Sequence, residues 1–298
     1  MLARLQKITT LSLLLGAAAW CAYWFDAHPA LAVVGALCLL FIHAPFLAVE
    51  FLLMAWINRN EPAPRATAGQ LLRAWWGEIW TTPAIFCWRQ PFRSNAEPNH
   101  LPVEGEGRRG VVLVHGFVCN RGFWTPWLQR LRAAGHPFIA VNLEPVFGEI
   151  PDYVAIIDAA VQRMQAATGL PPVLVCHSMG GLAARAWLAH ARDDTRAAHI
   201  ITIGSPHRGT WLGHFSRSPN ARQMVLDCDW LCQMAEREPP ERRSRFTCWY
   251  SNCDNIVFPT STATLSGADN RLLQGPAHVH MAFDERVIAH ALGLIASK

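Results

Sequence analysis

Charged residues are scarce in this chain of 298 residues. Aspartate, glutamate, lysine and arginine make up 16% of the sequence, whereas about 25% is usual for a soluble globular protein. Hydrophobic residues account for 51% and there are 13 tryptophans, so the composition excludes a disordered or low-complexity chain. The 26 basic and 22 acidic residues leave a net charge of +4 without a basic block, which excludes the electrostatic footprint of a nucleic-acid-binding protein.

The cysteines lack the spacing of a metal site or a disulfide framework. Their number, nine, is odd, and the pairs Cys228/Cys232 and Cys248/Cys253 have no histidine at zinc-finger intervals. We therefore expect reduced, mostly buried thiols in a reducing compartment.

Much of the charge deficit lies in the first sixty residues, which hold five charged residues. Residues 8–25 form an uncharged run of 18, and a helix of that length, at about 1.5 Å per residue, nearly spans a hydrocarbon core of about 30 Å. Residues 26–29 predict a turn, and a second apolar run over residues 30–57 is interrupted only by Glu50. Two spans joined in this way predict a transmembrane helical hairpin, with a kink in the second helix at Pro45.

The basic residues predict the orientation of this hairpin, which occupies residues 1–60. Arg4 and Lys7 precede the first span and Arg59 and Arg65 follow the second, so the positive-inside rule places both ends in the cytoplasm. We therefore expect a multi-pass protein in contact with a lipid bilayer. A signal peptide is the alternative for the first run, but it does not explain why a second apolar run follows at once.

Residues 61–105 are interpreted as a linker and an amphipathic connector. The linker, residues 61–64, reads Glu-Pro-Ala-Pro. Four apolar residues then recur at helical spacing and predict one stripe: Leu72, Trp76, Ile79 and Trp80. The stripe either lies on the membrane surface or packs on the domain that follows, and both alternatives stay open.

From residue 110 onward, short apolar runs alternate with helical patterns. The runs are typical of buried parallel strands and cover residues 111–114, 138–143, 173–176 and 200–203. The helical patterns between them cover residues 124–134, 153–167 and 179–191. This alternation predicts an α/β domain with a parallel sheet covered on both faces, where functional residues lie at the carboxyl ends of the strands.

The strand at residues 173–176 leads into a turn that carries Ser178. Residues 176–181 read Cys-His-Ser-Met-Gly-Gly, with small residues two positions before and after the serine. Such a turn holds the serine Oγ clear of the backbone, and the helix that follows offers unpaired N–H groups to an oxyanion. The segment resembles the nucleophile elbow of the α/β-hydrolase superfamily, in particular of its bacterial serine lipases and esterases, with Cys176 where glycine is usual.

This resemblance covers about residues 110–297 and implies an α/β-hydrolase fold in a domain at residues 106–298, preceded by the two transmembrane helices. It implies that Ser178 is the nucleophile. It also implies that the backbone N–H groups of Phe117, after the strand at residues 111–114, and of Met179 form the oxyanion hole.

The order of nucleophile, acid and histidine in this superfamily points to two further residues. Asp254 follows a β-rich run and resembles the orienting acid, with Asp269 and Asp229 as alternatives. His278, in the segment Gly-Pro-Ala-His before the last helix, resembles the general base, with His280 as the alternative.

Two histidines beside the predicted site, His115 and His177, are expected to have structural roles and to transfer no proton. Residues 204–210, Gly-Ser-Pro-His-Arg-Gly-Thr, resemble a segment of bacterial lipases, to which we assign no catalytic step. Asn220 is expected to cap a helix within the insertion at residues 208–245, which forms either a lid or an ordinary crossover.

The predicted function is that of a membrane-anchored serine hydrolase of the lipase or esterase type. It would cleave carboxylic esters with apolar acyl chains through an acyl-enzyme, without a metal or organic cofactor. An acyltransferase with the same triad is an alternative, because the triad does not specify the acceptor. A non-catalytic scaffold on a hydrolase fold is another. The bacterial resemblance and the predicted orientation together indicate a bacterial inner membrane, with the catalytic domain in the cytoplasm.

Overall fold

The computed structural model describes residues 1–102, 107–191 and 193–296. Over these residues, six strands form one sheet in the order β2-β1-β3-β4-β5-β6, and all neighbouring strands are parallel. The strands are β1 (Val111–Val114), β2 (Phe138–Ala140), β3 (Val173–His177), β4 (His199–Ile203), β5 (Phe246–Ser251) and β6 (Asp269–Leu273). The four strands expected from the apolar runs are confirmed, and β2 ends earlier than expected.

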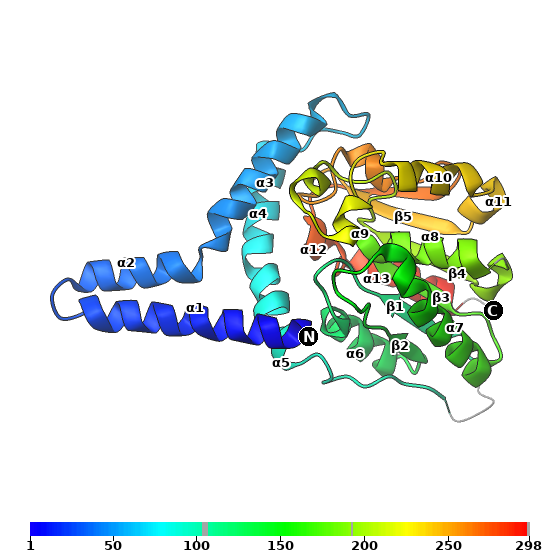
Figure 1. Ribbon diagram of the computed structural model, residues 1–298, viewed down its shortest axis with the longest axis horizontal. Coiled ribbons are helices and arrows are strands. Elements are labelled where there is room, and N and C mark those ends of the chain that lie inside the picture. Colours follow the sequence, from blue (N-terminus) through cyan, green and yellow to red (C-terminus); the bar gives the residue numbers. More distant parts are fainter. Residues whose placement is uncertain (103–106, 192, 297–298) are drawn as a thin grey trace.

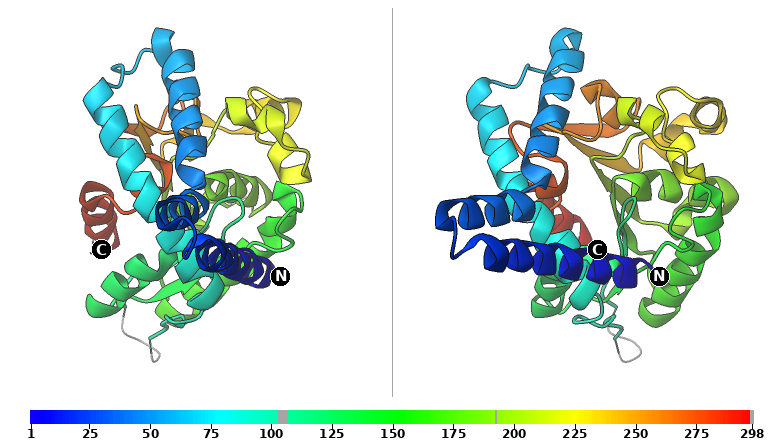
Figure 2. Two further views of the ribbon diagram at one scale, coloured as in Figure 1. Left: turned by 90° about the vertical axis from the view of Figure 1, so that its left-hand side faces the viewer. Right: turned by 60° about the vertical axis from the view of Figure 1, so that its left-hand side comes forward.

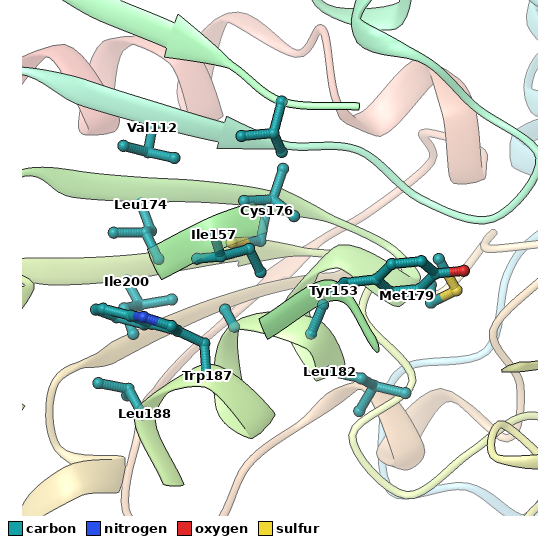
Figure 3. Packing of buried hydrophobic residues seen from close by; sticks show 14 of the residues in the cluster. Val112, Tyr153, Ile157, Leu174, Cys176, Met179, Leu182, Trp187, Leu188 and Ile200 are labelled. Carbon is teal, nitrogen blue, oxygen red and sulfur yellow. The ribbon is translucent and has the colours of Figure 1, made fainter. Parts of the chain in front are cut away.

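Helices cover both faces of the sheet, as the alternating pattern predicts. They are α6 (Thr125–Ala133), α7 (Val154–Thr168), α8 (Met179–Ala191), α12 (His278–Met281) and α13 (Glu285–Ala296). On one face α7 and α8 pack against Val112, Leu174 and Ile200, with Trp187 of α8 fully buried (Figure 3). On the other face α6 and α13 pack against Val111 and other residues that alternate with the first set. Burial of both faces is why the strands read as continuous apolar runs.

The first forty residues form a helical hairpin that projects from the sheet domain (Figure 1). Helix α1 (Leu2–Trp24) leads outward, and α2 (Pro29–Leu40) returns beside it, with the Trp20 indole donating a hydrogen bond of 3.2 Å to the Leu31 carbonyl. The 23 residues of α1 extend about 35 Å at about 1.5 Å per residue. By length and composition, α1 is apolar enough to cross a membrane.

The second expected span, for which the sequence predicted a kink at Pro45, is broken into two helices before that residue. Helix α2 ends at Leu40, and α3 (His43–Ile57) starts after a break with a bend of 50°. Among the described residues, α1 alone qualifies as a membrane span by itself. The bent pair α2 and α3 would add a second span only if the two helices together count as one broken span. The break precedes Pro45, which lies in the first turn of α3, where a missing N–H removes no helical hydrogen bond.

Packing on the sheet domain explains the bend. Leu47, Phe51 and Met54 recur on one side of α3 and are buried, two of them against the loop after β5. Helix α4 (Ala68–Pro83) lies beside α3 and packs on the same loops (Figure 2). It starts at a capping box, in which the Thr67 hydroxyl accepts from the Gln70 amide and the Gln70 side chain accepts from the Thr67 amide.

The single apolar stripe expected in α4 is divided between two faces of the helix. Ile79 is buried, whereas Leu72, Trp76 and Trp80 are 63%, 57% and 53% exposed. Packing on the sheet domain therefore accounts for the Ile79 face and leaves the tryptophan face exposed. After α4 the chain continues through a π-helical turn, η2 (Ala84–Arg89), and the short α5 (Gln90–Phe92).

The insertion between β4 and β5 holds a 3₁₀ turn, η6 (Trp211–Phe215), and three short α-helices, α9 (Pro219–Arg222), α10 (Asp229–Arg237) and α11 (Pro240–Arg243). The prediction that Asn220 caps the start of a helix was wrong. Asn220 is the second residue of α9, and its buried amide donates to the Val146 carbonyl and to the Tyr153 hydroxyl. Asp227, with φ of 47°, interrupts the helical backbone before α10.

All nine cysteines lie in the described residues, and all are free. Four of them are buried, Cys119, Cys176, Cys248 and Cys253, so the expectation that most thiols are buried was wrong.

Candidate active site

Ser178 occupies the sharp turn between β3 and α8, with φ of 54°. A residue with a Cβ is strained in this left-handed region, so the surrounding structure must hold it there. The Ser178 amide donates to the Ile203 carbonyl of β4 at 2.9 Å, and its carbonyl accepts from the Gly181 amide at 3.0 Å. These bonds tie the turn to the neighbouring strand and to the first turn of α8.

Glycines next to this turn are required by close approach. A Cβ on Gly180 would lie 2.5 Å from the Val114 carbonyl oxygen, and one on Gly116 would lie 2.8 Å from the Ser178 Cβ. The side chain of Cys176, at the position where glycine is usual, instead points into the apolar cluster under α8 (Figure 3). Burial raises the pKa of the Cys176 thiol, so it stays protonated.

His278 and Asp254 form a buried pair at the carboxyl end of the sheet. Asp254 lies in the loop after β5, and its Oδ1 accepts hydrogen bonds from the amides of Ile256 (2.9 Å) and Val257 (2.8 Å). His278 is the first residue of α12, and its Nδ1 lies 3.0 Å from both carboxylate oxygens of Asp254. Because a carboxylate only accepts, the Nδ1–H donates and the Nε2 is left to accept a proton.

The electrostatics of the pair favour a protonated imidazole. Burial disfavours the charged form, but the charge of Asp254, the hydrogen bond to it and the charges of Glu78 and Glu50 together raise the pKa of His278 above its ordinary value of 6.5. Gly204, at the end of β4, leaves room for this pair. A Cβ added to Gly204 would lie 3.0 Å from the Asp254 Oδ2 and 3.1 Å from the His278 Nδ1, and the φ of 57° at this position would also strain a residue with a side chain.

Two other histidines border the site without facing a carboxylate partner. The His177 Nε2–H donates to the His278 carbonyl at 3.2 Å, and its ring stacks on Phe123. The His115 Nε2 accepts from the Leu143 amide at 3.0 Å. Burial lowers the pKa of His115 to about 4 and that of His177 well below 6.5, so both rings stay neutral. Their contacts support the structural role expected for them.

A cavity of about 260 Å³ is lined by Ser178, His278 and His177, whereas Asp254 and His115 are not among its described lining residues. Its floor holds Ser178, His278 and Phe117, and its roof comes from Leu47 and Glu50 of α3 and from α4 and η2: Glu78, Thr82 and Phe86. Met179, the first residue of α8, lies directly beside Ser178, where a helix amide has no partner within the helix. None of the described lining residues belongs to the insertion at residues 208–245, so helices before the sheet domain, rather than this insertion, cover the site.

Sequence reasoning missed this roof and its two carboxylates. Glu78 is 1% exposed, and Glu50 Oε2 accepts from the Asn255 side chain at 2.7 Å. Burial raises the pKa of Glu78, and the hydrogen bond from the Val279 amide opposes that shift without cancelling it. A signal was present, since each is a solitary acid within an apolar helical pattern, and such a residue usually has a specific buried partner.

The alternative candidates lie elsewhere. Asp269 starts β6 and pairs with Arg271 at the surface, and Asp229 starts α10. His280 is exposed and lies against Gly77 of α4.

The segment at residues 204–210 supports the turn from behind. The buried side chain of Ser205 packs against Gly181, so closely that a Cβ on that glycine would clash with it. The His207 Nε2 lies 3.0 Å from the Thr202 hydroxyl. Arg185 of α8 donates to the His207 carbonyl and forms a buried ion pair with Glu238 at 2.7 Å. Across residues 1–102, 107–191 and 193–296, no three His, Cys, Asp or Glu side chains are grouped to hold a metal ion.

Comparisons with known proteins agree with this architecture. Esterase PIR7B of Oryza sativa subsp. japonica is 27% identical over 143 residues, which are 43% of this chain and 53% of the esterase, so the chain spans about half the length of this curated relative. Among solved structures, the mature lipase BlEst2 of Bacillus licheniformis has a TM-score of 0.58 at 15% identity, covering 65% of this chain and 95% of that one. Lipase B of Aspergillus fumigatus has a TM-score of 0.58 at 19% identity, covering 69% and 57%.

At such identities the structural matches establish the fold alone. The model of the alpha/beta hydrolase family matches residues 111–290, which include every strand of the sheet, the Ser178 turn and the buried His278–Asp254 pair. This chain therefore belongs to the alpha/beta hydrolase family.

Proposed function

We propose that this protein is a membrane-anchored serine hydrolase that cleaves carboxylic esters. The observation that carries the proposal is that His278, hydrogen-bonded to the buried Asp254, lines the same cavity as a serine held at φ of 54°. A serine in that conformation presents its Oγ at the top of a parallel sheet, beside the free amides of a helix start. The esterase and lipase relatives support an ester as the substrate.

In the proposed mechanism, the His278 Nε2 takes the Ser178 proton as Oγ attacks the ester carbonyl. Asp254 holds the Nδ1–H tautomer and stabilises the imidazolium that forms. The amides of Phe117 and Met179 bind the oxyanion of the tetrahedral intermediate. Its collapse expels the alcohol, which takes its proton from the imidazolium, and water then attacks the acyl-enzyme with the same base and releases the acid.

The apolar side chains that line the cavity are suited to bind an apolar acyl group. Leu47, Phe86, Phe117 and Ile256 provide apolar walls around Ser178. In hydrolysis of lipophilic esters, such walls bind the chain while the polar groups orient the carbonyl.

The bilayer is the proposed environment of the hairpin. Large apolar side chains are exposed along α1 and α2, and α1 has the length of a hydrocarbon core. Arg4 and Lys7 lie at the end of α1 nearest the sheet domain, and by the positive-inside rule this supports an active site in the cytoplasm, in the proposed case that of a bacterial cell. The chain would then consist of a hairpin region (residues 1–60), a connector (61–105) and a hydrolase domain. The boundary at residue 105 falls outside the described residues.

Labelling of the full-length protein in detergent with a fluorophosphonate probe tests the proposal. We expect one adduct on Ser178, with none in Ser178→Ala. Failure of folded, full-length protein to react, or labelling that persists in Ser178→Ala, would overturn it.

A further inference from the structure

The short helix that carries His278 lacks a cap of its own. Helix α12 has four residues, and Ala277 at its N-cap position has no side-chain oxygen to accept from the first amides of the helix. Ser, Thr, Asp or Asn at this position would normally accept from the second or third amide of the helix. In this protein those amides belong to Val279 and His280.

Glu78 of α4 supplies the missing acceptor from 201 residues earlier in the chain. Its Oε1 accepts from the Val279 amide at 2.6 Å and lies 3.4 Å from the His280 amide nitrogen. Its Oε2 accepts from the Thr82 hydroxyl at 3.1 Å, which fixes the carboxyl group on α4. Gly77 permits the close approach, since a Cβ there would lie 3.1 Å from the His280 ring.

The remaining amide of this turn is reached from α3. The His278 amide donates to Asn255 Oδ1 at 3.3 Å, and the Asn255 side chain donates to Glu50 Oε2 at 2.7 Å. Asn255 directly follows Asp254, so this chain of bonds also contacts the loop that carries the acid. Both helices of the roof therefore hold backbone groups next to the His278–Asp254 pair.

We propose that Glu78 is a positioning residue for the reaction, which caps the His278 turn from outside the sheet domain and makes α4 part of the active site. The inference rests on the proposed function, because it concerns the orientation of His278 as the base. A carboxylate that accepts two amides at a helix start fixes both the position and the direction of that helix. Without it α12 is free to shift, and displacement of a catalytic group by about 1 Å costs on the order of 10²-fold in rate.

The test compares Glu78→Ala with Glu78→Gln in full-length protein in detergent. Fluorophosphonate labelling run to completion counts the active sites, and p-nitrophenyl butyrate hydrolysis then gives kcat per titrated site and KM. We expect Glu78→Ala to lose on the order of 10²-fold in kcat per site with KM nearly unchanged. Glu78→Gln, whose amide oxygen still accepts from Val279, should keep kcat within about threefold of the wild type.

Glu61→Ala is the matched control. The Glu61 Oε2 also accepts a backbone amide of the sheet domain across the same interface, that of Ser261 at 2.7 Å, but in the turn η7 (Thr260–Ala263) rather than in α12. Its kcat per titrated site should equal that of the wild type. If Glu61→Ala lost as much kcat per titrated site as Glu78→Ala, the loss would reflect weaker docking of the two regions in general, and the proposal would be overturned.

The outcomes separate this inference from the proposed function. If the wild type is labelled and turns over but Glu78→Ala keeps its kcat per site, the positioning role fails while the serine hydrolase stands. If the wild type is not labelled, the proposed function itself fails. Should Glu78→Ala not fold, Glu78→Asp decides, because withdrawing the carboxylate by one methylene should lower kcat per site by roughly tenfold, and an unchanged kcat would refute the role.

Discussion

In residues 1–92 many large apolar side chains are exposed, whereas in residues 107–296 nearly all of them point into clusters on the two faces of the sheet. Of 25 exposed large hydrophobic side chains in the described residues, 23 lie in the first region, and only Phe147 and Phe215 lie in the second. A surface of this kind is unstable in water and is expected where a protein meets lipid. The comparison therefore supports a different solvent for each region.

The polar groups show the opposite arrangement. The first region directs Glu50, Asn58, Glu61 and Glu78 toward the sheet domain. Glu50 bonds the loop after β5, Asn58 and Glu61 bond the turn η7, and Glu78 bonds the start of α12. An anchor that only tethers a domain needs no such bonds. Glu50 and Glu78 also line the cavity that holds Ser178, so the two regions share the candidate site even though they differ in their outer surfaces.

The largest effect that we expect lies in the second region. Ser178→Ala should lower ester turnover by about 10³-fold or more, because residual activity then depends only on binding and the oxyanion hole. Hydrolysis of p-nitrophenyl butyrate in detergent measures it, with circular dichroism to verify folding. Turnover within tenfold of the wild type in this variant would mean that the chemistry resides on another residue.

The pH dependence should follow His278. A general base must be neutral, and although burial opposes the shift, Asp254 together with Glu78 and Glu50 raises the pKa of His278 above 6.5. kcat/KM should therefore rise with pH through this raised pKa, level off above it, and fall about tenfold for each pH unit below it. Asp254→Asn removes the charge and should move the acid limb to lower pH. An acid limb of the wild type centred below 6.5 would contradict the assignment.

Four of the six strands of the sheet could be predicted from sequence because their signals are local, whereas β6, which begins with polar, exposed residues, has no such signal. A strand buried on both faces must be apolar throughout, as in β1, and a serine at positive φ needs small neighbours, as around Ser178. The roof could not be predicted in this way. Glu78 stands out as a solitary acid in an apolar pattern, but its partner, the Val279 amide, lies 201 residues away, and no local pattern identifies that partner.

The same limit explains the second apolar run. Hydropathy describes how apolar a segment is, but α3 is apolar on both sides, with Phe51 and Met54 buried on the sheet domain and Phe46 and Leu52 exposed. A uniform apolar pattern is read as a membrane span. Docking on the domain instead bends the chain after α2.

Tryptophans in the two regions should differ in their contribution to stability. Trp187 is fully buried between α8 and the sheet, so Trp187→Ala should lower the free energy of unfolding by about 3 to 5 kcal/mol. Trp76 is 57% exposed on α4, and Trp76→Ala should change it by no more than about 0.5 kcal/mol. Urea unfolding in detergent micelles measures both. Equal losses would show that the outer face of α4 is packed against protein.

The smallest effect tests the lipid contact itself. In vesicles whose acyl chains carry bromine, tryptophans that touch lipid are quenched and those in the core of the sheet domain are not. Trp76→Phe should therefore remove fluorescence that bromine quenches, whereas Trp187→Phe should remove fluorescence that bromine does not quench. The change in total intensity is small in each variant, because 13 tryptophans contribute. Phenylalanine keeps most of the apolar area at both positions, so the folded structure should persist. If both variants lost unquenchable intensity, Trp76 would face water, and the contrast between the two surfaces would need an explanation other than the bilayer.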